Sequence, residues 1–288
     1  MNPRKRTAGQ SRYYVDLDRP KPGKTNAYER IPGVTTIVRE GLPKAAFVNY
    51  AGTATAEFAV NNWPELDALP PADRLKRISA GRYEKRDAAA GKGKLIHHIA
   101  QHAIGGEPVP VPEGVEGYVT AAIKFMDQFD VQPFPDCVEL VVFNETHYYC
   151  GTLDLGGTML IPDLSEYDWI PRDEDNRTRV IVDYKTGASG IWGDLGYQLA
   201  PYRFAEWGAT ETGEVIEVPE FDIGVGVHLR GDGTYSVVPV ECGPDEFEDF
   251  LTIKRMAEIV DRQRELVMTE IVPPLGNRIQ VVPTGERF

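Results

Sequence analysis

Two side chains of opposite charge stand two residues apart at the end of the β-branched run Arg179-Val-Ile-Val-Asp183-Tyr-Lys185-Thr-Gly187. Such a run favours a buried strand, and Thr-Gly favours a turn that ends it. Because side chains alternate along a strand, Asp183 and Lys185 point to the same face. A buried charge is costly unless it is paired or used. The pattern therefore indicates either an ion pair at the strand end or a catalytic site.

Other residues of the chain suit a metal site. Asp154 ends the segment Gly151-Thr-Leu-Asp154 on a neighbouring expected strand, and His97 lies on an expected helix. Two carboxylates and an imidazole would suit a hard divalent ion such as Mg²⁺ or Mn²⁺. A lysine mounted on a strand beside them would orient a water or offset charge on a phosphoryl group. Gln198 and Tyr202, four residues apart, share one helix face after that strand.

A zinc site is the alternative for the histidines. His98 and His102 are spaced to share one helix face. Ile99 stands where zinc metalloproteases place a glutamate after the first histidine. We therefore expect these two histidines on a helix surface.

Hydrophobic periodicity predicts the elements that must position these residues. Helices are expected over 44–61, 70–89, 82–102, 113–129, 191–207 and 244–268. Strands are expected over 137–143, 147–155, 179–185, 220–229 and 234–241, the last two as a hairpin. Residues 31–38 fit either a strand or the start of a helix that Thr35 would cap. Residues 161–178 fit an acidic solvated loop. Residues 1–26 are basic and rich in Pro and Gly, which favours a flexible arm or a short ribbon around Tyr13-Tyr14-Val15.

Composition bounds the class of protein. The 288 residues suffice for one or two domains. The sequence contains no long apolar run, so neither a membrane span nor a secretory signal is expected. Three scattered cysteines predict neither a disulfide framework nor a zinc ribbon, so the cytoplasm is the expected compartment. The net charge is −13, but residues 1–94 carry 18 Lys and Arg against 10 Asp and Glu, whereas residues 95–288 carry 13 against 34. This asymmetry indicates either a polyanion-binding face or a chance segregation of charge.

Four motifs in order resemble the PD-(D/E)XK nuclease superfamily, in its RecB-like branch, and most of all the phage-type relatives of CRISPR-associated RecB-like exonucleases. Gly93-Lys-Leu-Ile-His97 is similar to the G-x-x-x-H helix of that branch, and Gly151-Thr-Leu-Asp154 to its G-x-x-D strand. Asp183-Tyr-Lys185-Thr is similar to its D-x-K-T strand, and Gln198-Leu-Ala-Pro-Tyr202 to its Q-x-x-x-Y helix. The opening Ile31-Pro-Gly-Val-Thr-Thr-Ile-Val38 also resembles these phage proteins.

The resemblance implies an α/β fold with a restriction-endonuclease-like core, a mixed central sheet flanked by helices, and a helical N-terminal part over the active-site groove. We expect a basic arm over 1–26 and a single nuclease domain over 27–288, helical over 27–130 and α/β over 131–270. The implied function is that of a DNA exonuclease in recombination, repair or phage replication, in the host cytoplasm if phage-encoded, with single strands or duplex ends as partner and no membrane.

The resemblance also implies roles for particular residues. His97, Asp154, Asp183 and the Tyr184 carbonyl would hold Mg²⁺ or Mn²⁺, Lys185 would assist the attacking water, and Gln198 and Tyr202 would support the lysine or the nucleic-acid backbone. Glu139 fits an outer carboxylate of the site or a solvated strand residue. Several relatives carry an iron–sulfur cluster on four cysteines, a spacing that this chain lacks, so no cluster is expected.

The charge split points to a path for DNA and leaves alternatives open. Basic residues just before His97 would contact phosphates without reading bases. They are Arg82, Lys85, Arg86, Lys92 and Lys94. One alternative is a catalytically inactive nucleic-acid-binding protein on the same fold. Another is a metal-dependent hydrolase with a different substrate.

Overall fold

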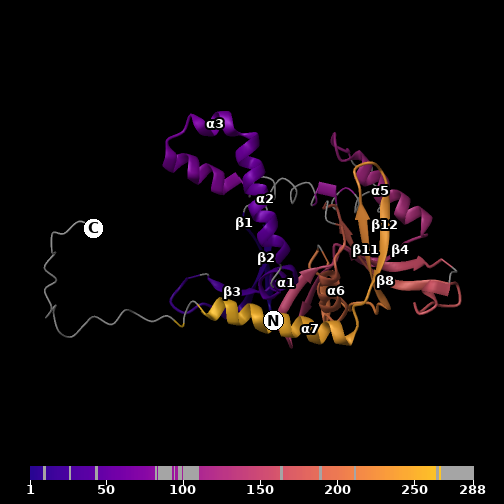
Figure 1. Ribbon diagram of the computed structural model, residues 1–288. Coiled ribbons are helices and arrows are strands. Elements are labelled where there is room, and N and C mark those ends of the chain that lie inside the picture. The colour runs from indigo at the N-terminus through magenta and orange to yellow at the C-terminus, as the bar shows by residue number, and fades with distance from the viewer. Residues whose placement is uncertain are drawn as a thin grey trace, which may run out of the picture.

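The computed structural model describes residues 1–8, 11–25, 27–42, 45–81, 83, 93, 95–96, 99, 110–162, 165–187, 190–210, 212–263 and 266. These residues form three β-sheets with helices packed against them (Figure 1). Across these ranges, no helix combines the length and apolar character needed to cross a membrane.

The central sheet has five strands in the order β12-β11-β8-β7-β4. They are β4 (Gln132–Val138), β7 (Leu155–Leu160), β8 (Arg177–Lys185), β11 (Ile223–Leu229) and β12 (Tyr235–Val240). The middle strand, β8, runs parallel to β11 and antiparallel to β7, so the sheet is mixed. This confirms the expected α/β architecture. β8 is buried from Val180 to Tyr184, as its β-branched residues favour.

Helices cover both faces of the central sheet (Figure 1). On one face, α5 (Glu116–Gln128) packs in a core that contains Val180, Val182 and Tyr184. On the other face, Ile181 shares a core with residues of α1 (Val34–Gly41), α6 (Gly196–Arg203) and α7 (Pro244–Arg262). Alternate residues of β8 thus serve two cores, which leaves Asp183 and Lys185 on the side of α6.

Several expected elements are confirmed. The hairpin of β11 and β12, helix α5 and helix α7 lie where hydrophobic periodicity predicted them. Residues 34–41 are a helix, but Gly33 rather than Thr35 is the N-cap. The described part of the acidic segment before β8 contains one short 3₁₀ helix, η1 (Ser165–Tyr167).

The helix predicted over 191–207 is shorter than expected. A 3₁₀ turn, η2 (Gly193–Leu195), leads into α6, which ends at Arg203. Trp207 instead belongs to a strand, because it pairs with Phe143. Pro201 lies inside α6, and the amide of Phe204 still donates to the carbonyl of Ala200 at 3.0 Å.

The strands predicted over 137–143 and 147–155 are each broken in two. A second sheet, in the order β10-β9-β5-β6, takes β5 (Val141–Asn144), β6 (Tyr149–Thr152), β9 (Trp207–Ala209) and β10 (Val215–Ile216). Glu139 has a left-handed φ of 52°, which ends β4 there. The amide of Glu139 donates to the carbonyl of Asp154 at 3.0 Å. The segments that contain these two residues therefore lie side by side where each passes from one sheet to the other. Asp154 therefore sits at the junction of two sheets.

The N-terminal residues form a ribbon, which was one of the two alternatives for residues 1–26, and not a flexible arm. Strands β1 (Pro3–Ala8), β2 (Ser11–Pro20) and β3 (Tyr28–Ile31) make a three-stranded antiparallel sheet. Buried Asp16 accepts the amides of Asn2 and Asp18, and the Tyr14 ring meets Phe143 edge-on. These tertiary contacts order the basic ribbon and decide between the two alternatives.

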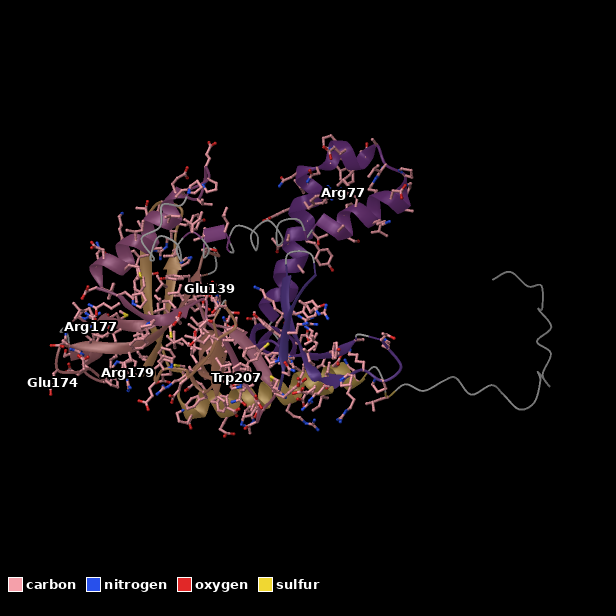
Figure 2. The ribbon with its side chains drawn as sticks, turned by 180° about the vertical axis from the view of Figure 1, so that it is seen from behind. Arg77, Glu139, Glu174, Arg177, Arg179 and Trp207 are labelled. Carbon is pink, nitrogen blue, oxygen red and sulfur yellow. The ribbon has the colours of Figure 1, made fainter. Side chains whose placement is uncertain are left out.

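The helical region expected over 27–130 is only partly helical, since it includes β3. After α1 come α2 (Ala45–Asn61), α3 (Trp63–Asp67) and a helix over 71–81. Figure 1 shows α2 leading away from the sheets to α3 at its far end. Arg77 lies on this projection, well apart from Glu139 (Figure 2).

Candidate active site

Asp183, Lys185 and Gln198 form a closed set of contacts at the end of β8. The ammonium of Lys185 lies 2.6 Å from Oδ2 of Asp183. Gln198 donates from Nε2 to Oδ1 of Asp183 at 2.7 Å and accepts from Lys185 at Oε1 at 3.3 Å. Asp183 is 3% exposed, whereas the Lys185 side chain is 33% exposed. The carboxylate is thus buried, whereas the lysine side chain is partly exposed.

Asp154 joins this set from the neighbouring strand. β7 begins at Leu155, which lies opposite Val182 on β8, so Asp154 is the residue just before the paired strand. Oδ2 of Asp154 accepts the backbone amide of Tyr184 at 2.8 Å, which fixes the orientation of the carboxylate. The structure therefore brings the two expected metal carboxylates together.

Tyr202 lies one helical turn after Gln198 on α6 and is 2% exposed. A Cβ on Gly151 would lie 2.2 Å from Cε1 of the Tyr202 ring. The glycine of G-x-x-D and the tyrosine of Q-x-x-x-Y therefore touch, and the missing side chain at 151 makes room for the ring. Sequence reasoning selected both residues but could not predict this contact, which joins α6 to β6.

The charges of the site shift the pKa values of its members. Burial acts to lower the pKa of Lys185, but the carboxylates of Asp183, Asp154 and Asp194 outweigh it, and the pKa is raised. Burial raises the pKa of Tyr202; hydrogen bonding to Thr35 and Gln198 opposes this, and Asp183 and Asp154 reinforce it. At neutral pH Lys185 is therefore an ammonium and Tyr202 a neutral phenol. Their chemistry is electrostatic and hydrogen-bonding rather than basic.

The donor atoms of the site fit a hard divalent cation. Asp154 and Asp183 offer carboxylate oxygens, and the Tyr184 carbonyl is the third oxygen expected from the resemblance. A cationic group already contacts Asp183 at 2.6 Å, which shows that positive charge is accommodated there. Among the residues that the structure describes, no three His, Cys, Asp or Glu side chains gather round one point. Two carboxylates are therefore the side-chain donors that the described part could offer to such an ion.

Several predicted residues lie outside the described ranges. They are the expected ligand His97 and the basic residues Arg82, Lys85, Arg86, Lys92 and Lys94. Gly93 is described: a Cβ on it would lie 3.4 Å from Oγ1 of Thr186, the residue after Lys185. Ile96 is fully buried in the core that contains Tyr184. The roles of His97 and of the five basic residues remain predictions.

Three residues at the site were missed by sequence reasoning. Thr35 on α1 is hydrogen-bonded to Tyr202, and the charge of Asp194 acts on Lys185. His228 lies opposite Lys185 on β11 and bonds through Nε2 to the Gly187 carbonyl at 2.8 Å. The signal in the sequence was the position of Thr35 within the opening motif, where it was predicted to cap a helix and not to contact Tyr202.

No protein-family model matches this chain, and a search of curated proteins finds no similar sequence. The argument for function therefore rests on the motifs and on the geometry of Asp154, Asp183, Lys185 and Gln198.

Replacing Gly151 by Ala should destabilise the protein, because the new Cβ would overlap the Tyr202 ring. Overpacking of this kind lowers the free energy of unfolding by about 1–3 kcal/mol. Thermal denaturation would measure the loss. Gly193→Ala is the matched control, since a Cβ there meets nothing within 4 Å. Equal melting temperatures for the two variants would contradict the contact between Gly151 and Tyr202.

Proposed function

We propose that this chain is a metal-dependent DNA exonuclease of the PD-(D/E)XK superfamily, in its RecB-like branch, with a restriction-endonuclease-like core. It would act on single strands or duplex ends in recombination, repair or phage replication. The observation that carries the proposal is the hydrogen bond from the Tyr184 amide to the Asp154 carboxylate, with Lys185 and Gln198 in contact with Asp183 on the same strand end.

The site provides the parts that phosphodiester hydrolysis needs. In this reaction water adds to phosphorus and a P–O bond breaks, so negative charge builds on the phosphoryl oxygens. Mg²⁺ or Mn²⁺ held by Asp154 and Asp183, with the Tyr184 carbonyl and His97 as further expected ligands, would supply a Lewis acid and lower the pKa of a bound water.

The side chains of this protein would orient the water and stabilise charge during hydrolysis. The Lys185 ammonium places positive charge beside the carboxylates and would stabilise the developing negative charge and orient the water. Gln198 contacts both Asp183 and Lys185, so it fixes their separation. Tyr202 supports Gln198 from within the same helix. This arrangement is set before substrate binds, which is what electrostatic stabilisation requires.

Two other functions would use the same fold. A catalytically inactive nucleic-acid-binding protein is disfavoured because Asp154, Asp183 and Lys185 are all present and in place. A hydrolase with a different substrate would share the metal site but not the need for a polyanion path. Residues 95–288 carry a net charge of −21, which repels DNA, so the basic residues just before His97 are proposed to offset it; they are Arg82, Lys85, Arg86, Lys92 and Lys94.

Purified protein should degrade end-labelled DNA in Mg²⁺ or Mn²⁺ and stop when a chelator removes the metal. Denaturing gels of 5′-labelled and 3′-labelled single strands, blunt duplexes and closed circles would reveal whether an end is required. Cleavage of linear but not circular DNA is the expected result. Binding without cleavage in either metal would favour the inactive alternative, and neither binding nor cleavage would favour another substrate.

A further inference from the structure

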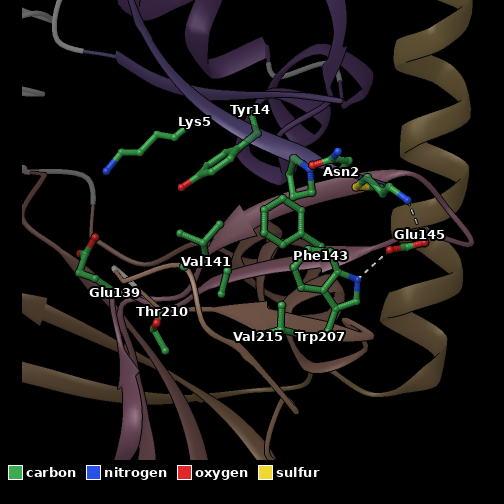
Figure 3. A pocket seen from close by; sticks show the side chains of 14 residues that line it. Asn2, Lys5, Tyr14, Glu139, Val141, Phe143, Glu145, Trp207, Thr210 and Val215 are labelled. Carbon is green, nitrogen blue, oxygen red and sulfur yellow. Dashed lines mark hydrogen bonds and ion pairs between the residues drawn. The ribbon is translucent and has the colours of Figure 1, made fainter. Parts of the chain in front are cut away.

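A cavity of about 760 Å³ lies between the N-terminal ribbon and the second sheet (Figure 3). Residues of β1 and β2 line it on one side, and residues of β5, β9 and β10 on the other. Its walls combine aromatic rings with aliphatic side chains, and charged side chains stand at its ends. The proposed chemistry at Asp154 and Asp183 does not use it.

The aromatic walls have a fixed geometry. Trp207 stacks on Phe143 with ring centroids 4.4 Å apart, and Tyr14 meets Phe143 edge-on at 5.4 Å. Nε1 of Trp207 donates to Glu145 at 3.1 Å, which holds the indole in place. Held rings of this kind offer flat surfaces on which a planar heterocycle can stack.

Lys5 brings a positive charge to the cavity. It pairs with Tyr14 across β1 and β2, so both side chains are on the cavity face of the ribbon. Arg4, the preceding residue, points to the opposite face. Figure 3 shows Lys5 and Glu139 toward one end of the cavity and Trp207 with Glu145 toward the other. Lys5 is the cation that would attract an anionic group at this end, against the opposing charge of Glu139, and the aromatic rings lie deeper inside.

The Lys5 end of the cavity adjoins the candidate active site. Glu139 lines the cavity, and its backbone amide donates to the carbonyl of Asp154 at 3.0 Å. A molecule that filled the cavity would thus touch Glu139, whose backbone is bonded to that of Asp154, a residue of the proposed metal site. This placement favours a part of the substrate as the occupant.

We propose that the cavity binds one unpaired nucleotide of the DNA strand, next to the bond to be cut. The base would lie against the aromatic wall of the cavity, and its phosphate would face Lys5. The inference rests on the proposed nuclease function and adds a preference for unpaired strands, because a base within a duplex cannot enter. A free mononucleotide has the same chemistry, so the experiment must separate the two sources.

Two substitutions test the cavity without removing buried packing. Lys5→Ala removes the cation, and Val215→Trp fills the cavity from a valine that is 65% exposed. Arg4→Ala is the control for charge, because it removes a cation from the other face of the same strand. Val238→Trp is the control for bulk, because Val238 is 41% exposed on β12, outside the cavity. Melting temperatures would confirm that all four variants fold.

The readout is cleavage of a labelled single strand and of a blunt duplex in Mn²⁺, with anisotropy of the labelled strand in Ca²⁺ as a measure of binding. Lys5→Ala and Val215→Trp should each raise the KM for the single strand about tenfold, the size expected for one stacked base, with kcat nearly unchanged. The two controls should match the wild type. An active wild type with unchanged KM in both variants would overturn the cavity proposal and leave the nuclease proposal standing.

The remaining outcomes also decide between the proposals. If the wild type cleaves nothing, the nuclease proposal fails, and strand affinity in Ca²⁺ still tests the cavity with the same four variants. Thymidine 5′-monophosphate is the probe for a free nucleotide. If both cavity variants lose affinity for this probe but keep their affinity and KM for the strand, the occupant is a free nucleotide and the proposal as stated is wrong.

Discussion

Replacing Asp183 by Asn should abolish metal-dependent cleavage, with a loss of more than about 10²-fold, the scale on which a single preorganised charged or polar group acts. Asn keeps the size of the side chain but removes the negative charge that a divalent ion and Lys185 share. Asp183 contacts Lys185 and Gln198 at once, so its loss also releases the geometry of both. Calorimetry with Mn²⁺ should show weakened binding alongside the loss of cleavage.

Asp222→Asn is the matched control for this prediction. Asp222 also holds a cation, Arg179, at 2.6 Å, but near the opposite end of β8. Hydrogen bonds from Arg179 outweigh the effect of burial and keep the pKa of Asp222 below its usual value. We expect Asp222→Asn to lower the melting temperature at neutral pH and to leave metal binding and kcat unchanged. An equal loss of cleavage in the two variants would contradict a specific role of Asp183 in metal binding and cleavage.

Replacing Lys185 by Met should lower the cleavage rate by about 10²- to 10³-fold, as removal of one preorganised electrostatic group does in other enzymes. Met keeps an unbranched side chain of similar reach and lacks the ammonium. Unlike Asp183→Asn, this variant should still bind Mn²⁺, because both carboxylates remain. The separation of metal binding from turnover distinguishes the roles proposed for the two residues.

Stability provides a second readout for Lys185→Met. Without the ammonium, the buried Asp183 carboxylate loses its contact at 2.6 Å, so the metal-free variant should melt below the wild type. A divalent ion that binds only the folded state should restore much of that loss. Lys124→Met is the control, since Lys124 on α5 donates to the Gly233 carbonyl outside the site. Cleavage by Lys185→Met at the wild-type rate would show that Lys185 takes no part in the reaction.

Local periodicity was enough to predict much of this chain. The β-branched run before Asp183 forms a buried strand, and the alternation of its side chains places Asp183 and Lys185 on one face, as the sequence indicated. The hairpin of β11 and β12 and helix α7 were also predictable, because each follows from residues close together in the chain. Gln198 was predicted on a helix after the strand, and it is there.

Only the tertiary structure decided how these pieces meet. The Asp154 carboxylate reaches the Tyr184 amide because the chain leaves one sheet and enters another between Thr152 and Leu155, a break that hydrophobic alternation did not reveal. The contact between Gly151 and Tyr202 and the cavity under the N-terminal ribbon likewise join residues far apart in sequence. Alternation along a strand is a property of the local backbone, whereas the register between strands depends on long-range packing that no short segment encodes.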